Sequence, residues 1–408
     1  MDDTIKRCLK VEATATARAA EAERFQTDRV LTISVGHAVH DTYTAFLAPL
    51  LPAFIANLSL SNTEAGLLTV FMQWPSLLQP FIGHLADRVS LRYLFILAPA
   101  VTAVMMSLLG IAPSYAALAL LLIVTGVSSA SLHAVGPVMA GNLSGRSLGQ
   151  GMSFWMVGGE LGRTLGPILV VSAVQLLTLK GTPGLMIGGL LASAILYARL
   201  KDVPGRPPNA GQGLPWRQAL RRMRPLLVPL AGIIVARSFM ISALTTYLPI
   251  FMSEEGAGLW LAGASLTVLE AAGVVGALLG GTMSDRLGRR VVLFISMLTT
   301  PCLMFVFLAS KGWVQFSLLL VLGFTALSVT PVLMALVQES FPENRALANG
   351  VYMALSFCLR SGVVVALGAL GDYFGLRPAF AASAVIPLLG LPLILLLPGK
   401  RLRHSLER

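Results

Sequence analysis

The sequence is poor in charge and in cysteine for its length. Only 12% of its 408 residues are charged, whereas 55% are hydrophobic and the mean hydropathy is +0.77. Soluble domains carry about 25% charged residues, so this composition all but excludes a soluble globular protein. A bilayer core needs roughly 20 apolar residues for each helix that crosses it. The length therefore suits a helical membrane protein with twelve spans and short loops.

The three cysteines, Cys8, Cys302 and Cys358, lie far apart. Their spacing predicts neither a disulfide framework nor a metal cluster, and we interpret them as packing residues in a reducing compartment. Residues 1–27 alternate charged residues with alanine and lack the apolar core of a signal peptide. We therefore expect a cytosolic extension there.

Twelve apolar segments follow this extension. They lie near 28–56, 63–86, 92–112, 114–141, 147–176, 183–201, 224–253, 259–285, 290–309, 312–338, 345–371 and 376–398. The one break in composition is rich in proline, glycine and arginine, which is typical of a linker. The predicted parts are a cytosolic N-terminal extension (1–27), an N-terminal six-helix bundle (28–201), a cytosolic linker (202–223), a C-terminal six-helix bundle (224–398) and a cytosolic tail (399–408).

The basic residues gather on one side of the predicted spans. Lys and Arg number 30 against 19 Asp and Glu, which gives a formal net charge of +11. If the N-terminus is cytosolic, 24 of these 30 basic residues lie on the cytosolic side. This is the positive-inside bias of membrane proteins, and it predicts that both termini are cytosolic. It also explains the net charge without a nucleic-acid partner.

The two halves of the chain contain the same motif. The first copy runs from Gly83 through Asp87 and Arg88 to Arg92, and the second from Gly281 through Asp285 and Arg286 to Arg290, 198 residues later. A second pair of matching segments begins at Arg146 and Arg345. Parallel repeats of six spans are typical of transporters.

The paired Gly-x-x-x-Asp-Arg loops resemble the signature of the major facilitator superfamily. The resemblance implies an all-α integral membrane protein with twelve transmembrane helices in two six-helix pseudo-symmetric bundles. Within this superfamily, His37-Ala-Val-His-Asp41-Thr-Tyr43, Gln79-Pro80, His133 and Arg237-Ser238 resemble the fosmidomycin resistance protein family. The resemblance also implies a bacterial cytoplasmic membrane.

Ionisable residues inside the spans are functional candidates, because charge in a bilayer is costly. For proton coupling we predict Asp41, His37, Glu160 and Glu270. For substrate binding we predict Arg163, Arg237, Arg360, His133, Tyr43 and Gln79.

Each of these assignments has a plainer alternative. Glu160 and Arg163 are three residues apart on one helix, so they also suit a local structural pair. His133 is equally well interpreted as a hydrogen-bonded core histidine. The His37-x-x-His-Asp41 pattern suits a metal site, but no further Cys/His cluster accompanies it in the sequence, so we predict no metal and no cofactor.

The repeated loops have a separate predicted role. An Asp at the end of one span and basic residues at the start of the next can form a charged latch that holds one side closed. We predict gating for Gly83, Asp87, Arg88, Arg92, Gly281, Asp285, Arg286 and Arg290. The alternative is a topology anchor, which explains the arginines but not the repeated aspartate.

The combined prediction is a proton-coupled antiporter that exports a small organic or drug-like compound by alternating access. The alternatives are an importer or uniporter of a small organic anion, or a solute sensor that does not transport. The sequence lacks the nucleotide-binding motif of an ATP-driven pump and the His-Glu-x-x-His and Gly-x-Ser-x-Gly motifs of enzymes. The expected partners are the lipid bilayer, a small-molecule substrate and protons, with the protein as a monomer.

Overall fold

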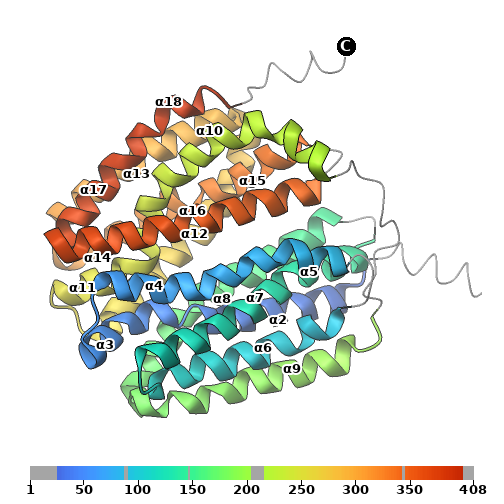
Figure 1. Cartoon of the computed structure of the whole chain (residues 1–408), viewed down its shortest axis with the longest axis horizontal. Coiled ribbons are helices and arrows are strands. Elements are labelled where there is room, and N and C mark those ends of the chain that lie inside the picture. Colours follow the sequence, from blue (N-terminus) through green and yellow to red (C-terminus); the bar gives the residue numbers. More distant parts are fainter. Residues whose placement is uncertain (1–24, 87–90, 146–147, 204–215, 342–344, 398–408) are drawn as a thin grey trace, which may run out of the picture.

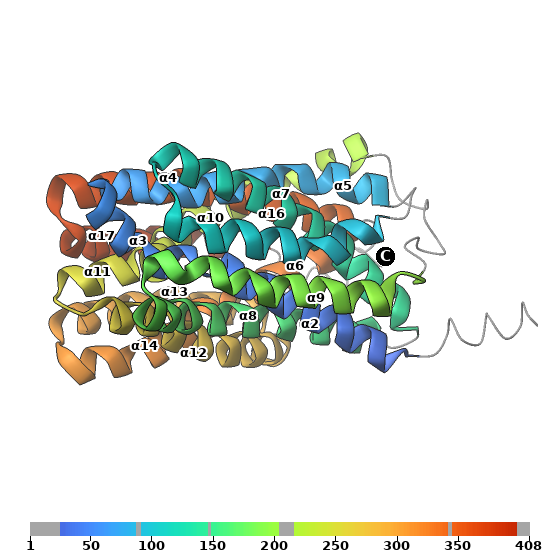
Figure 2. The same ribbon diagram turned by 90° about the horizontal axis from the view of Figure 1, so that it is seen from below.

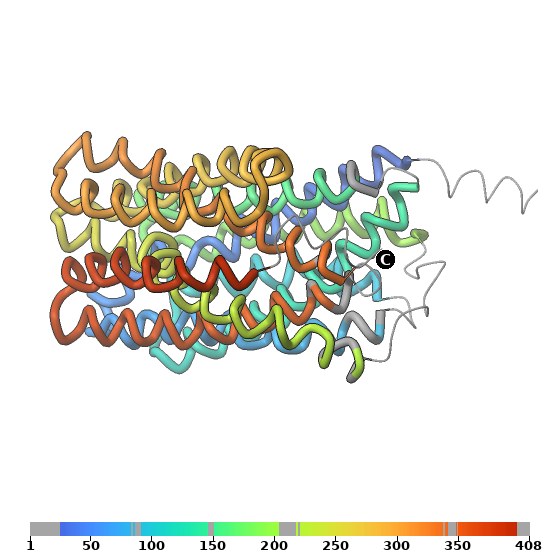
Figure 3. Tube along the Cα trace, turned by 90° about the horizontal axis from the view of Figure 1, so that it is seen from above, coloured from blue at the N-terminus to red at the C-terminus, as the bar shows by residue number. Residues whose placement is uncertain are grey.

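The computed structural model describes residues 25–86, 91–145, 148–203, 216–341 and 345–397. Within these ranges the regular structure is entirely helical. The helices form two groups, α2–α9 from the N-terminal half and α10–α18 from the C-terminal half, which lie one below the other in Figure 1. The N-terminal half is in front when the protein is seen from below (Figure 2), and the C-terminal half when it is seen from above (Figure 3).

The elements of the N-terminal half follow the six predicted spans in order. They are α2 (Thr27–Thr44) with α3 (Leu47–Leu58); α4 (Asn62–Gln73) with η1 (Trp74–Leu78) and α5 (Gln79–Ala86); α6 (Arg92–Ser107) with η2 (Leu108–Ile111); α7 (Tyr115–Leu143); α8 (Leu148–Leu177); and η3 (Leu179–Leu185) with α9 (Met186–Leu200).

The C-terminal half follows the other six. Its elements are α10 (Trp216–Ser242) with the π-helical turn η4 (Ala243–Tyr247) and α11 (Leu248–Glu254); α12 (Leu259–Leu287); α13 (Arg289–Ala309); α14 (Gly312–Leu327) with α15 (Val329–Ser340); α16 (Arg345–Phe374); and α17 (Leu376–Leu389) with α18 (Leu391–Ile394).

Ten of these helical stretches are long and apolar enough to cross a membrane. The first two spans are not among the ten. The first is interrupted by a turn at Ala45–Phe46, just before Pro49 and Pro52, and the second changes to a 3₁₀-helix around Pro75. Proline lacks a backbone N–H and clashes with the preceding turn, so it breaks or kinks a helix at such places.

The apolar core is shared by the two halves at one end of the molecule and divided at the other. We call the end where α4 and α12 begin and α8 and α16 end the distal end. One cluster of buried residues contains Phe46 and Leu50 together with Tyr247 and Phe251, so it belongs to both halves. A second cluster around Met223 lies in the C-terminal half, and a third around Ile33 and Trp155 lies in the N-terminal half. The halves are thus joined mainly at the distal end.

Helices α2 and α8 approach each other closely along a row of glycines. A Cβ atom added at Gly158, Gly162 or Gly166 would lie 2.3–2.4 Å from a backbone oxygen of Ser34, Ala38 or Thr42, respectively. Small residues four apart allow such packing between membrane helices. The Gly-x-x-x-Gly-x-x-x-Gly spacing of α8 therefore places its small residues at the contact with α2.

The substitution Gly158→Ala tests this packing. We expect it to destabilise the protein by about 1–3 kcal/mol, because the new methyl group overpacks the contact with α2. The matched control is Gly362→Ala in α16, where an added Cβ meets no atom within 4 Å. There alanine removes the conformational cost of glycine in a helix and leaves stability unchanged or raises it. Thermal unfolding in detergent measures both, and equal midpoints for the two variants would contradict the packing role.

Candidate functional site

Three ionisable side chains from two helices meet in the N-terminal half. His37 and Asp41 lie one turn apart on α2, and His133 reaches them from α7. The Nε2 atoms of the two histidines are 3.3 Å apart. Asp41 Oδ2 lies 3.4 Å from Nε2 of His37, and Asp41 Oδ1 lies 3.7 Å from Nε2 of His133. We call these three residues the His–Asp tripod.

The ring nitrogen of each tripod histidine that points away from the tripod, Nδ1, faces a backbone carbonyl. Nδ1 of His37 is 2.9 Å from the oxygen of Trp155, and Nδ1 of His133 is 2.9 Å from the oxygen of Ser129. A carbonyl oxygen only accepts hydrogen bonds, so both Nδ1 atoms carry a proton and donate it. The His37 ring also stacks on the indole of Trp155, with ring centroids 3.7 Å apart. Hydrogen bonds from both rings and the stacking on Trp155 therefore fix the orientation of the two histidines.

His40 is next to the tripod but is directed elsewhere. Its Nδ1 is 3.1 Å from the hydroxyl of Thr102, which donates to Ser128. Ser128 in turn donates to the carbonyl of Ala98. His40 thus anchors a buried polar chain between α2, α6 and α7.

Arg163 of α8 lies near two carboxylates, those of Glu160 and Asp41. It forms an ion pair with Glu160, one turn earlier on the same helix, and its Nη1 lies 3.8 Å from Asp41 Oδ2. The side chain of Arg163 is 43% exposed, whereas that of Asp41 is only 5% exposed. The guanidinium therefore forms the accessible edge of the polar centre.

A cavity of about 150 Å³ lies against this edge, between the two halves. It is lined by residues of both, which are Thr44, Ala45, Ala48, Met72, Arg163, Pro167, Leu266 and Glu270. Glu270 comes from α12 and is buried. Within the described ranges no hydrogen bond or ion pair reaches its carboxyl group, although Arg163 and Arg360 are near enough for their charges to act on it.

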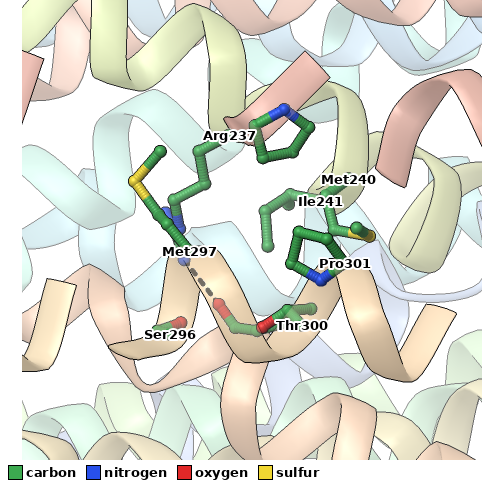
Figure 4. A pocket seen from close by; sticks show the side chains of 9 residues that line it. Arg237, Met240, Ile241, Ser296, Met297, Thr300 and Pro301 are labelled. Carbon is green, nitrogen blue, oxygen red and sulfur yellow. Dashed lines mark hydrogen bonds between the residues drawn. The ribbon is translucent and has the colours of Figure 1, made fainter. Parts of the chain in front are cut away.

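The other two intramembrane arginines lie in the C-terminal half. Arg360 of α16 donates to the hydroxyl of Thr245 in the π-helical turn, at 2.7 Å. Arg237 of α10 donates to the carbonyl of Ala326 (2.8 Å) and to Thr330 (3.2 Å). Arg237 also lines a pocket of about 20 Å³, large enough for one water (Figure 4). Its partners lie inside the C-terminal bundle, not in the cavity between the halves.

Two further residues that were predicted to bind substrate lie away from the lining of the cavity. The hydroxyl of Tyr43 donates to Leu185 (2.5 Å) and accepts from the N–H of Gly189 (3.1 Å), so it joins α2 to η3 and α9. Gln79 is the first residue of α5 and is half-buried. Neither belongs to the residues that line the cavity.

One of the predicted gating residues, Asp285, belongs to an ion network at the second repeat. Asp285 at the end of α12 pairs with Arg289 at the start of α13, at 2.5 Å, and Arg289 also pairs with Glu339 of α15, at 3.0 Å. Arg289 and Glu339 were missing from the sequence prediction, although Arg289 lies inside the repeated motif. Gly281 and Arg286 lie on α12, and Arg290 donates to the carbonyl of Leu397.

The first repeat is described only in part. Asp87 and Arg88 lie outside the described residues, and Gly83 lies in α5. Arg92 begins α6 and donates to the carbonyl of Val203, at 3.1 Å. This contact ties the start of α6 to the chain just after α9.

A second latch, which the sequence analysis missed, joins the halves at the distal end. The carboxylate of Asp372 in α16 accepts hydrogen bonds from the N–H groups of Asn62 (2.6 Å) and Thr63 (2.9 Å) and from the Thr63 hydroxyl. An anion suits the positive end of a helix such as α4. Close by, the hydroxyl of Tyr247 bonds the carbonyls of Asn62 and Val364. In the sequence, the only sign of this latch is a single Asp near the end of a predicted span.

Comparison with known proteins fits this architecture. The profile of the Major Facilitator Superfamily matches residues 33–363 and, in a second match, 267–407. The chain belongs to the major facilitator superfamily. It is a multi-pass membrane protein and a secondary transporter of small molecules, not an enzyme, and the predicted family and fold class are confirmed.

Individual relatives are distant but match over nearly their whole length. The fosmidomycin resistance protein of Escherichia coli (strain K12) is 24% identical, over 90% of this chain and 92% of its own. The MFS-type transporter YfnC of Bacillus subtilis (strain 168) is 26% identical, over 92% and 94%.

Solved structures share the fold of this major facilitator. A bacterial homologue of the human lysosomal transporter Spinster, in an inward-facing and occupied conformation, superposes with a TM-score of 0.78 at 15% identity, covering 91% of this chain and 96% of that one. A D-xylose–proton symporter superposes with a TM-score of 0.72 at 15% identity, covering 91% and 97%.

The distal latch leads to a prediction about conformation. In Asp372→Ala three hydrogen bonds to a charged acceptor are lost, each worth about 1.5–3 kcal/mol. We expect the population with an open distal end to rise at least about tenfold. Spin labels at the exposed residues Lys180, in η3, and Lys311, just before α14, report the opening as a longer distance in double electron–electron resonance.

The matched control is Glu255→Ala. Glu255 pairs with Arg377 at 2.7 Å within the C-terminal half, so its loss removes a charge without releasing the other half. Identical distance distributions in Asp372→Ala and the parent protein would show that Asp372 is no latch.

Proposed function

We propose that this transporter exports a small organic anion in exchange for protons. The observation that carries the proposal is that Arg163 and Glu270, from opposite halves, line one cavity. A cation that can hold an anionic substrate thus faces an acid that can hold a proton. Alternating access requires that both halves contribute to one central site.

Arg163 supplies the substrate contact in this proposal. Its guanidinium is paired with Glu160, and a carboxylate or phosphonate of the substrate competes with Glu160 for it. A second cation, Arg360, acts on Glu270 from the C-terminal half. When the anion leaves, the pair of Arg163 and Glu160 forms again.

Glu270 supplies the proton site of the exchange. An ionised carboxylate without a hydrogen-bond partner is costly away from water, so the neutral acid is the form that suits the return of the empty transporter. In this exchange Glu270 takes up a proton on the outer side after the anion has left. It releases the proton to the cytosol, where water or Arg163 stabilises the ionised form. The proposed exchange therefore depends on Glu270, while the roles of Glu160, Asp41 and His37 as proton carriers stay predictions.

The proposed setting is a bacterial cytoplasmic membrane, with both termini cytosolic and the protein as a monomer. In that orientation the shared core and the Asp372 latch lie on the outer side. The name of the Escherichia coli relative supports export of a drug-like compound, and the relation by sequence is distant. Import or uniport of an organic anion is the second candidate, because Arg163 alone can bind an anion without any proton.

Glu270→Gln is the direct test of proton coupling. In liposomes with a trapped pH dye and an imposed proton gradient, phosphonates, organic anions and amphiphilic drugs are added one at a time. We expect a compound that drives proton movement in the parent protein, and a loss of about 5–150-fold in Glu270→Gln, the range of a coupling free energy of about 1–3 kcal/mol. Substrate binding should be retained, because Arg163 is unchanged.

Glu254→Gln serves as the control, because it removes a carboxyl at the end of α11 that does not line the cavity. Labelled solute that still equilibrates while no protons move in the parent protein would favour the uniporter. Unchanged proton movement in Glu270→Gln would remove Glu270 from the coupling mechanism.

We propose that the Asp285, Arg289 and Glu339 network gates the end opposite the distal latch. Asp285→Asn breaks one arm of this network, in which the Asp285 side chain is 62% exposed. We expect turnover to fall about two- to fivefold with KM unchanged, since an exposed ion pair contributes up to about 1 kcal/mol. Initial rates at several substrate concentrations separate the two parameters, and a change in KM alone would argue for a binding role instead.

A further inference from the structure

The His–Asp tripod has the geometry of a metal site, which the proposed transport mechanism does not use. Two bonds of about 2.0–2.1 Å at a tetrahedral angle place their ligand atoms about 3.3 Å apart. The tripod distances are 3.3 Å between the two Nε2 atoms, and 3.4 and 3.7 Å from these atoms to the Asp41 oxygens. We infer that His37, His133 and Asp41 bind one divalent transition-metal ion, with Zn²⁺ as the best match.

Hydrogen bonds around the tripod leave its inner atoms free for a cation. Because Nδ1 of each histidine donates to a carbonyl, the lone pair of each neutral ring lies on Nε2. Two nitrogen lone pairs and the two oxygens of one carboxylate thus face one another at 3.3–3.7 Å. Histidines that bind metals almost always donate their other N–H to a carbonyl or carboxylate in this way.

A metal ion can bond at once to both Nε2 atoms and to an oxygen of Asp41, whereas a proton cannot. A proton on one Nε2 makes one hydrogen bond, to the second ring or to Asp41, and leaves the remaining acceptor facing another acceptor. An ion at the centre bonds to both nitrogens and one carboxylate oxygen. The competing cation Arg163 is paired with Glu160 and lies 3.8 Å from Asp41 Oδ2, so Asp41 Oδ1 is the carboxylate oxygen that remains for the ion.

The surrounding packing fixes the ligands before any ion arrives. His37 is stacked on Trp155, and a Cβ atom at Gly159 would lie 2.5 Å from Cε1 of His37 and 3.1 Å from Asp41 Oδ2. His37 and Asp41 are buried, whereas the side chain of His133 is 28% exposed and leaves a way in. Rigid ligands on packed helices favour a defined coordination geometry.

The ligand set indicates the class of ion. Two imidazoles and one carboxylate suit Zn²⁺, Co²⁺, Ni²⁺ or Fe²⁺, whereas Mg²⁺ and Ca²⁺ prefer oxygen ligands. Three protein ligands leave a fourth position for water or for an oxygen of an anionic solute. The sequence analysis predicted no metal because it counted only the residues of one segment, and His133 lies about a hundred residues away from its partners.

Binding of Co²⁺ to the purified full-length protein in detergent tests this inference. The protein carries no polyhistidine tag and is stripped of metal before titration at pH 7. We expect one Co²⁺ per chain, with the intense visible bands of a four-coordinate site, displaced by Zn²⁺. Each of His37→Gln, His133→Gln and Asp41→Asn should weaken binding more than about 100-fold, since loss of even an outer partner costs about 10–100-fold.

Two controls and one measurement on the parent protein complete the test. His404→Gln removes a histidine from the C-terminal tail, and Glu270→Gln removes the proposed proton site. Both should bind Co²⁺ as the parent does, so that loss of transport and loss of metal are separable. X-ray absorption of the Zn²⁺ form, which needs no variant, should show two imidazole ligands at about 2.0 Å.

Binding of Co²⁺ weaker than about 1 mM would overturn the inference. So would binding that His133→Gln leaves at parental strength, or an absorption spectrum without imidazole scattering.

Discussion

The close approach of α2 to α8 is the contact on which the polar centre of this transporter depends. Glycines on α8 allow the backbone of α2 to come near enough that Asp41 reaches both His133 and Arg163. Any larger side chain at these positions would separate the helices and move Arg163 away from the carboxylate. In a membrane such a loss is severe, because the hydrocarbon offers no replacement for a missing partner.

The two halves meet through contacts that are related by the internal repeat. Span five packs on span eight, where the N–H of Ile168 donates to Thr267 and Gly263 lies against Val171. Span eleven packs on span two, where Asp372 and Tyr247 hold the start of α4. The arrangement is symmetric in the backbone but not in chemistry, since the His–Asp tripod and the Glu160–Arg163 pair belong to the N-terminal half alone. The C-terminal half contributes Glu270 and Arg360.

Much of the fold followed from composition and repetition. Long apolar runs and two matching Asp-Arg loops predicted two bundles of six spans, because span length and loop charge are set by the bilayer itself. The i, i+4 spacing of His37 and Asp41 likewise placed both side chains on one face of a helix.

Contacts between helices could not be predicted from the sequence, because they depend on how neighbouring helices are shifted and rotated against each other. Arg237 looked like a cavity residue, yet its partners Ala326 and Thr330 lie within its own bundle. Tyr43 is next to Thr44, which lines the cavity, but its hydroxyl joins α2 to η3 and α9. Asp372 carries no motif at all, and its meaning comes only from the start of α4, some three hundred residues earlier in the chain.

The division of the apolar core has a thermal consequence. The cluster that joins both halves must be pulled apart when the distal end opens, and a different set of apolar side chains must come together at the other end. Unless the two sets are equal in area, the two orientations differ in heat capacity, because apolar surface exposed to water raises it. The balance between inward-facing and outward-facing molecules then varies with temperature along a curve, as the stability of a folded protein does.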